Sequence, residues 1–482
     1  MPVSPFNLCG GTEITRDSLW SNSRAINWFP ITDTSGTAQS KVELAPIPGL
    51  QVFTTLTNPP IRGLFAGDNR LFAVAAGELY EIFANGSATV IPNVVPGGPS
   101  VLNAATPVQF AANGGPSASL LIASGDSIWY ATNTTHKTKD GAISVVYLDG
   151  YYIILWADGQ TIQISTDGLT WDPLDVGQSQ GPVDRKVRLE AHEGHLWLFG
   201  QRSISVWYDS GNADFPFAPI DGATIDQGTM APWSVTRIDR KLYWLGMNEH
   251  GYGRVFRTEG YTPVPISNQA IEYLIKTYLD LGTDQCITGS GYTENGHTFY
   301  VLSFPKAKAC LVYNLSTNMW HERARWNADQ WQHWRGASFH AFCFGKHIVA
   351  RTSEAPFPDG DHTKIYEQGL HIFGDDGNRI RRYRAAPYTQ ADQQWLFHHY
   401  LRLLTSGSSA VTMRYLYDDG TTWSQERVVA PFKHEIKYRR LGRARDRMYE
   451  LYLLDSLTEA QGIIEGYLHL ADPPQNPATI AR

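Results

Sequence analysis

The stretch Glu193-Gly194-His195-Leu196-Trp197-Leu198-Phe199-Gly200 joins a polar turn, an apolar strand and a small-residue break. Glycine adopts the positive φ that tight hairpins require, and the apolar run has the composition of a buried strand. The same pattern recurs in seven apolar runs: Arg70–Val74, Ser119–Ala123, Tyr151–Leu155, His195–Phe199, Lys241–Leu245, His297–Val301 and Lys346–Ala350. The recurrence indicates one β-structured unit repeated along the chain.

The spacing of these runs predicts a β-propeller. Their starts lie 49, 32, 44, 46, 56 and 49 residues apart. A propeller blade repeats at roughly 40 to 50 residues, because four short antiparallel strands and their turns need that much chain. We therefore expect an all-β fold with a propeller of about seven blades, and the short 32-residue interval leaves six blades as an alternative.

The overall composition agrees with many short strands. The chain has 482 residues, of which 43 are Gly, 27 are Pro and 12% are aromatic. Such a composition is typical of strands separated by turns and does not suit long helices. The best helical stretch is Asn268 to Leu281, where Ile271, Leu274, Ile275 and Tyr278 recur at helical spacing.

Charge and cysteine content limit the function classes. Forty basic and 47 acidic residues give a formal charge of −7, which argues against a protein whose main task is to wrap DNA but does not exclude a wall that DNA passes. The four cysteines match no metal motif or disulfide framework, so we expect reduced, structural thiols. We see no secretion signal and no run of 18 apolar residues, so we expect folding in a cytoplasm and no membrane insertion.

The rhythm of the chain suggests four regions. We expect residues 1–60 to be an extended arm with a few strands, able to lend one strand that closes the ring. We expect residues 61–387 to form the propeller, and the longer alternating strands of residues 388–471 to form a separate C-terminal β-sandwich-like domain. Residues 472–482 are rich in Pro and Ala and are expected to be a flexible tail.

Two turns resemble the Asp-box of sialidase-type propellers, at Ser165–Trp171 and at Tyr417–Trp423. The second match is weaker because Tyr417 stands where a Ser is usual. We interpret both as structural turns and assign that role to Asp167, Gly168, Trp171, Asp419, Gly420 and Trp423. The alternative, a sialidase-like propeller glycosidase acting on surface glycans, needs convergent arginines with a nucleophilic Tyr and a general acid, and no spacing singles out such a set.

No other motif points to catalysis or to a bound group. His398 and His399 are adjacent in an expected strand and so point to opposite faces, which disfavours a shared metal ion. Phosphate-binding, dinucleotide-binding and nucleophile-elbow motifs are absent from the sequence. We therefore expect no enzyme activity, no cofactor and no metal.

One basic segment stands out near the C-terminus. Seven cations crowd into 15 residues, beginning with Lys433. A solvated strand edge explains them without function, because charge prevents unwanted strand pairing. The functional interpretation is a docking face for an acidic partner surface or for DNA, since Arg binds both carboxylate and phosphate. The docking candidates are Lys437, Arg439, Arg440, Arg443, Arg445 and Arg447.

Eight short segments of the sequence together suggest a family. The first four are Asn27–Pro30, Leu44–Leu50, Ile61–Phe65 and Arg70–Tyr80. The later four are Ser203–Tyr208, Asp226–Thr229, Val264–Glu272 and Tyr438–Arg445. In content and order these segments resemble the packaged-DNA stabilisation proteins, which are tail-hub or head-completion proteins of short-tailed phages.

The resemblance implies a structural protein without catalytic residues. It implies a homo-hexameric ring in the virion tail that attaches below the adaptor ring of the portal, continues the channel for packaged DNA and retains the genome. It also implies seats for a tailspike or tail fibre and for a tail needle or plug, and assembly in the host cytoplasm. A generic propeller scaffold that binds host proteins is a further alternative, but it would not explain the C-terminal domain and its basic segment.

Overall fold

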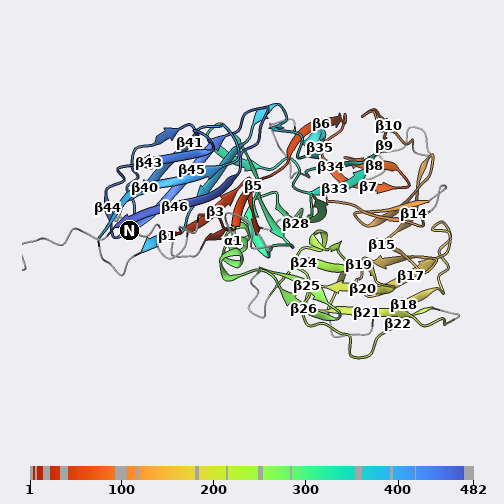
Figure 1. The fold of residues 1–482 in the computed structure, drawn as a ribbon. Coiled ribbons are helices and arrows are strands. Elements are labelled where there is room, and N and C mark those ends of the chain that lie inside the picture. The colour runs from red at the N-terminus through yellow and green to blue at the C-terminus, as the bar shows by residue number, and fades with distance from the viewer. Residues whose placement is uncertain are drawn as a thin grey trace, which may run out of the picture.

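The computed structural model describes residues 4–5, 8–14, 22–32, 42–92, 106–114, 119–179, 184–212, 215–247, 253–282, 285–352, 361–390, 395–417 and 420–471. The fold is all-β, and the described residues contain one α-helix, α1 (Gln269–Leu279). Its N-cap is Asn268, whose side chain accepts a hydrogen bond from the Ile271 N–H, so the helix expected in this stretch is confirmed. The molecule has two parts, a ring of blades and a β-sandwich beside it (Figure 1).

Seven four-stranded blades make the ring in the described part of the chain. The first three are β7 (Ile61–Gly67), β8 (Arg70–Ala75), β9 (Glu78–Ile82) and β10 (Ala88–Val90); β11 (Gln109–Ala112), β12 (Leu120–Ser124), β13 (Ser127–Ala131) and β14 (Thr135–Asp140); and β15 (Ala142–Leu148), β16 (Tyr151–Trp156), β17 (Thr161–Ser165) and β18 (Val176–Gln178). The fourth and fifth are β19 (Lys186–His192), β20 (His195–Gly200), β21 (Ile204–Asp209) and β22 (Phe217–Pro219); and β23 (Thr236–Ile238), β24 (Lys241–Met247), β25 (Gly253–Glu259) and β26 (Thr262–Pro265).

The last two blades complete the count. The sixth is β27 (Thr288–Glu294), β28 (His297–Phe304), β29 (Ala309–Asn314) and β30 (Met319–Glu322), and the seventh is β33 (Phe339–Cys343), β34 (Lys346–Ala350), β35 (Lys364–Gly369) and β6 (Gly49–Thr55). The seven apolar runs of the sequence are the second strands of the blades, β8, β12, β16, β20, β24, β28 and β34. The predicted propeller is confirmed with seven blades.

The ring is closed by a strand from the N-terminal region. β6 pairs antiparallel with β35, so that the first and last strands of the propeller in sequence share one blade. Leu50 on β6 and Tyr366 on β35 are buried in one core with Val349. Without this strand β35 would present an open edge, so the closing strand expected from the sequence is present.

The second part is a sandwich of two sheets. One sheet has the order β4 (Trp28–Thr32), β5 (Val42–Pro46), β46 (Ile463–Ala471), β40 (Leu396–Thr405) and β43 (Glu435–Arg439), with β1 (Ser4–Pro5) on β46 and β44 (Arg443–Ala444) on β40. The other has the order β3 (Asn22–Ile26), β38 (Arg381–Ala385), β45 (Asp446–Leu454), β41 (Val411–Leu416) and β42 (Arg427–Val429), with β2 (Glu13–Ile14) on β3 and β39 (Thr389–Gln390) on β45. Alternate side chains of both sheets meet in one core that includes Trp28, Leu401 and Leu451.

The N-terminal residues are folded into both parts. The region expected as an extended arm provides β1 to β5 for the sandwich and β6 for the propeller. β38 falls within the range 61–387 expected for the propeller, but it pairs with β3 and β45 of the sandwich. Whether a strand belongs to the propeller or to the sandwich is therefore decided by its pairing with strands that are far away in sequence. Residues 472–482 lie outside the described residues.

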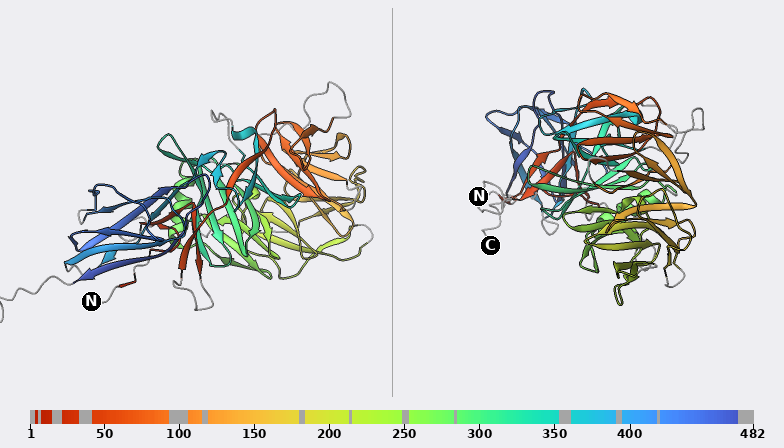
Figure 2. Two further views of the ribbon diagram at one scale, coloured as in Figure 1. Left: turned by 45° about the horizontal axis from the view of Figure 1, so that its top comes forward. Right: turned by 90° about the vertical axis from the view of Figure 1, so that its right-hand side faces the viewer.

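A short parallel pairing joins the propeller to the sandwich. β3 lies beside β30 of the sixth blade, with Ile26 opposite Glu322. The Arg24 guanidinium donates to both carboxylate oxygens of Glu322 at 2.7 Å. Buried Arg384 of β38 donates to the carbonyls of Leu8 and Gly11, and so holds the N-terminal segment in this joint. The sandwich extends to one side of the ring (Figure 2).

Smaller elements complete the chain. They are the 3-10 turns η1 (Pro232–Ser234) and η2 (Asp361–Thr363), the hairpin β31 (Ala324–Asn327) and β32 (Gln330–His333), and the pair β36 (Gly374–Asp375) and β37 (Asn378–Arg379). η2 and β31 contribute to a buried charge cluster in which Asp361 is bound by Arg325 and by Arg335, the latter at 3.0 Å.

Candidate partner-docking surface

The basic segment lies on the sandwich. β43 is the last strand of its sheet and pairs with β40, and β44 pairs with the start of β40. β43 and β44 lie toward the end of the sandwich away from the propeller (Figure 1). Arg439, Arg440, Arg443 and Arg445 are exposed, and Lys437 is half-buried. We call these five residues the basic face.

Aromatic rings carry several of these cations. The Lys437 ammonium lies 4.6 Å from the centroid of Tyr400 on the neighbouring strand β40. Arg443 and Arg445 both lie 4.8 Å from the ring of Trp395, which is 36% exposed. Such cation–π contacts fix the directions of long side chains and lower the entropy that a partner must remove on binding. The basic face is therefore ordered as well as charged.

An exposed apolar strip borders the basic face. Val428 on β42 is 66% exposed, and Phe432 in the connection from β42 to β43 is 76% exposed. Arg427, also on β42, donates to the carbonyl of Arg439 at 2.8 Å and ties the two strands together. Exposed apolar area next to ordered cations is the composition expected of a protein-binding surface.

Arg447 is the one docking candidate that the structure buries. It is 2% exposed, and its guanidinium donates to the carbonyls of Leu441 at 2.6 Å and Arg443 at 3.1 Å. The guanidinium also covers the ring of Tyr415 at 4.1 Å. A partner cannot reach this side chain in the folded chain, so Arg447 supports the loop that presents Arg443 and is not part of the basic face.

The first Asp-box turn is satisfied internally. The Asp167 carboxylate accepts hydrogen bonds from the N–H groups of Leu169 and Thr170, both at 2.8 Å, and from the Ser165 hydroxyl at 2.9 Å. Burial opposes ionisation, but these hydrogen bonds outweigh it and lower the pKa of Asp167 to about 2. Gly168 has φ +73°, and a Cβ there would lie 2.7 Å from Leu121 Cδ1. Trp171 packs against the core between the second and third blades.

The second turn is described in part. The Tyr417 N–H donates to the Thr422 carbonyl and the Gly420 N–H to the Tyr417 carbonyl, while Trp423 lies under the Arg414 guanidinium at 4.4 Å. Asp419 lies outside the described residues.

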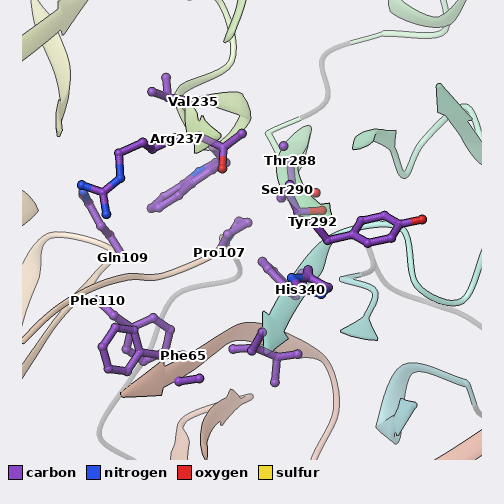
Figure 3. Close-up of a pocket in the computed structure, with 18 of the residues that line it drawn as sticks. Phe65, Pro107, Gln109, Phe110, Val235, Arg237, Thr288, Ser290, Tyr292 and His340 are labelled. Atoms are coloured by element: carbon purple, nitrogen blue, oxygen red, sulfur yellow. The ribbon is translucent and has the colours of Figure 1, made fainter. Parts of the chain in front are cut away.

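A cavity of about 1200 Å³ lies on the axis of the propeller. It is lined by the first strands of the blades, from β7 to β33 (Figure 3). Two lining arginines, Arg188 and Arg237, come from the first strands of consecutive blades, β19 and β23, and Arg188 is paired with Glu190 at 3.3 Å. Glu294, a second lining carboxylate, accepts hydrogen bonds from Gln368 and from the Leu370 N–H. The described lining thus brings together two arginines, not the three that a sialidase-like site needs.

The described part of the chain contains neither a cluster of metal ligands nor an exposed cysteine thiol. No group of three or more potential ligands is close enough to hold a metal ion there. Cys9, Cys286, Cys310 and Cys343 are all buried and form no disulfide within the described ranges, and burial raises the pKa of Cys9 and Cys310 to about 12. His398 is buried against Tyr449, and burial together with Arg447 lowers its pKa to about 3. Within the described ranges, no helix has the length and apolar character to cross a membrane.

Comparison with protein families gives one match that covers most of the chain. Residues 5–356 match the family described as bacteriophage P22 Gp10, beta-propeller. The matched range includes the N-terminal strands and the propeller as far as the seventh blade. No protein with a curated description matches the sequence.

The solved structures that match this fold have low sequence identity to the chain. The extracellular domain of a one-component system from B. thetaiotaomicron has 10% identity and a TM-score of 0.42, with 86% of this chain and 59% of that chain covered. The Pan2 WD40 domain of Neurospora crassa has 9% identity and a TM-score of 0.41, with 66% and 95% covered. YCF48 from Cyanidioschyzon merolae has 9% identity and a TM-score of 0.40, with 66% and 98% covered.

Proposed function

Because the chain belongs to the phage stabilisation family described as bacteriophage P22 Gp10, beta-propeller, we propose that it is a hub of a short-tailed phage tail. Membership of this family supports a phage structural stabilisation role and a place in the virion. In our proposal six copies form a ring below the adaptor ring of the portal, continue the DNA channel and retain the packaged genome.

The shape of the molecule supports a role with several partners. A seven-bladed disc is rigid because each blade packs on two neighbours, and it offers two faces and an outer edge. The sandwich adds a separate binding surface beside the disc (Figure 2). In a ring, many such contacts act together, so that individually weak contacts give a lasting joint. We propose that these surfaces also seat a tailspike or tail fibre and a tail needle.

The observation that carries the proposal, beside the family membership, is the basic face. Its exposed arginines stand on a β-sheet and are held by aromatic rings, as a surface that binds an acidic protein partner requires. By contrast, the carboxylates of the axial cavity are engaged by neighbouring groups. We therefore propose a structural component that assembles in the host cytoplasm, and not a glycosidase.

Cryo-electron microscopy of purified particles tests this function. We expect density for a propeller and a sandwich between the adaptor ring and the fibres, repeated around the tail axis. Particles made without the protein should fill with DNA and then lose it. Density for this chain at the distal tip of a fibre, or genome retention without it, would contradict the proposal.

A further inference from the structure

Two exposed surfaces of opposite charge lie on different parts of the molecule. The basic face lies toward the end of the sandwich away from the propeller (Figure 1). On the propeller, the turns that join the first and second strands of four blades carry exposed acids, Asp68, Asp149, Glu193 and Asp239. We call these four residues the acidic rim.

The acidic rim lies on one face of the disc. Each blade repeats the same strand order about the propeller axis, so all turns between first and second strands lie on the same face. Asn295, from the equivalent turn of the sixth blade, lines the axial cavity, which places the rim around one mouth of that cavity. On the opposite face, the turns after the second strands mix Asp126 and Asp158 with Arg202 and Lys308. Among the described turns between first and second strands, four carry an exposed acid and one of these, Asp239–Arg240, also carries an exposed arginine, whereas the turns of the opposite face carry both signs in similar measure.

The carboxylates of the acidic rim are largely uncompensated within the chain. Among the described residues, Glu193 is paired with Arg240 at 3.2 Å, whereas Asp68, Asp149 and Asp239 form no ion pair. Exposed apolar side chains accompany them on the same face, because Leu169 and Leu174 lie in the turn between the third and fourth strands of the third blade and are 44% and 82% exposed. The face of the disc that carries the acidic rim thus has the same two components as the basic face and its border, which are charge and exposed apolar area.

The distribution of charge decides which kind of self-contact is favourable. In a two-fold contact each surface meets its own copy, so the basic face would oppose a basic face and the acidic rim an acidic rim. A head-to-tail contact instead brings opposite charges together, and repetition of one head-to-tail contact generates a closed ring or a filament. The two surfaces lie on different parts of one chain, which suits contact between neighbouring copies.

We propose that the basic face of one copy docks on the acidic rim of the next copy, and that this head-to-tail contact builds the ring. The proposal deepens the hub function and rests on it. Arg439, Arg440, Arg443 and Arg445 pair with rim carboxylates through bidentate hydrogen bonds, while Phe432 and Val428 cover apolar side chains of the neighbouring disc. The occupant of the basic face is thus a second copy of this chain.

Charge reversal in assembled particles tests the contact. One variant carries Arg439→Glu, Arg440→Glu, Arg443→Glu and Arg445→Glu, a second carries Asp68→Lys, Asp149→Lys and Asp239→Lys, and a third combines both sets. Lysine is acceptable at these turn positions, which have φ near +50°, because Lys308 and Arg240 already adopt φ of +53° and +60°. A control variant, Arg202→Glu with Lys308→Glu, reverses charge on the opposite face of the disc.

The measurement is the number of hub copies per purified particle, with thermal unfolding as a check of the fold. We expect each single-surface variant to lower the number of hub copies per particle at least about tenfold, the combined variant to restore this number, and the control variant to match the wild type.

Two other outcomes would overturn the proposal. Wild-type incorporation of the rim variant, together with a combined variant that stays unincorporated, would assign the basic face to an acidic adaptor. Normal incorporation of all variants with genome loss confined to the arginine variants would overturn it in favour of DNA contact. If wild-type particles contain no copies of the chain, the hub function itself fails.

Discussion

Arg443 and Arg447 stand four residues apart in one basic segment but have different environments. Arg443 is exposed and stacks on Trp395, whereas Arg447 is 2% exposed and donates to two backbone carbonyls. Both residues are arginines in a strand-rich region, so residue type gives no means of separating them. The difference arises because β45 enters the sandwich core two residues after Arg445.

Replacement of Arg447 should affect stability rather than docking. Arg447→Met keeps the volume but removes the donors to the carbonyls of Leu441 and Arg443, and leaving buried acceptors unsatisfied costs about 1–3 kcal/mol each. We expect a loss of about 2–4 kcal/mol in the free energy of unfolding, measured with urea. Arg443→Met is the matched control and should change this free energy by less than about 0.5 kcal/mol. Equal effects of the two substitutions would contradict the assignment.

His398 should make the sandwich sensitive to acid. Burial, with a contribution from Arg447, lowers the pKa of its imidazole to about 3, below the ordinary value of 6.5. The unfolded chain therefore binds a proton at this site that the folded chain rejects, and stability falls as the pH drops from about 6.5 to about 3. The loss amounts to about 1.4 kcal/mol per pH unit within this window.

The variant His398→Gln isolates this effect. Glutamine does not titrate, so the stability of the variant should change less between pH 7 and pH 4.5 than that of the wild type, as followed by urea unfolding at each pH. His399→Gln is the control, because His399 is exposed. A wild type and a His398→Gln variant with the same pH dependence would show that His398 does not carry the acid sensitivity.

At the scale of the elements, the repeated unit is the second strand of a blade. Each such strand is bordered on both sides within its blade and reads as a continuous apolar run, so its position and length can be predicted from sequence. The outer strands are shorter and less regular, as β10, β18 and β22 illustrate with three residues each. Short outer strands leave a weak signal because few of their side chains enter the core.

β6 should be essential for the closed ring. Thr54 pairs with Ile365 on β35, and the substitution Thr54→Pro removes a backbone donor from this ladder. We expect a loss of about 3 kcal/mol or more in the free energy of unfolding, together with aggregation through the open edge of β35. Thr54→Val keeps the N–H group and the β-branched shape, and it should be close to wild type. Calorimetry and light scattering measure the two effects, and a stable monomeric Thr54→Pro variant would contradict the role of β6.

At the scale of the whole molecule, the joint between propeller and sandwich is made by N-terminal residues. Arg24 on β3 and Glu322 on β30 form a bidentate pair, and the Glu322 side chain is 6% exposed. The N–H of Thr12 donates to the Trp320 carbonyl at 2.7 Å across the same joint. The two parts of the molecule are thus fixed to each other by N-terminal residues of the sandwich, which precede the blades in sequence.

Loss of the Arg24–Glu322 pair should uncouple the two parts. Arg24→Ala leaves the Glu322 carboxylate without its bidentate partner, and we expect a destabilisation of about 3 kcal/mol at the joint. Calorimetry should then show two separate unfolding transitions where the wild type shows one. Arg402→Ala removes an ion pair with Glu435 that is about one third exposed and should leave the unfolding profile unchanged. A single transition for Arg24→Ala would contradict the role of this pair.

The sequence by itself determined the all-β class, the seven repeated strands and the helix after Asn268, because local periodicity and turn chemistry specify them. It also contained the acids of the propeller turns, although turn chemistry alone explains them without any function. Only the tertiary structure decided that β1 to β5 belong to the sandwich, that Arg447 is buried, and that four acidic turns share one face of the disc. These features depend on pairing between residues hundreds of positions apart, and local sequence carries no information about which distant strand edge or blade a segment will meet.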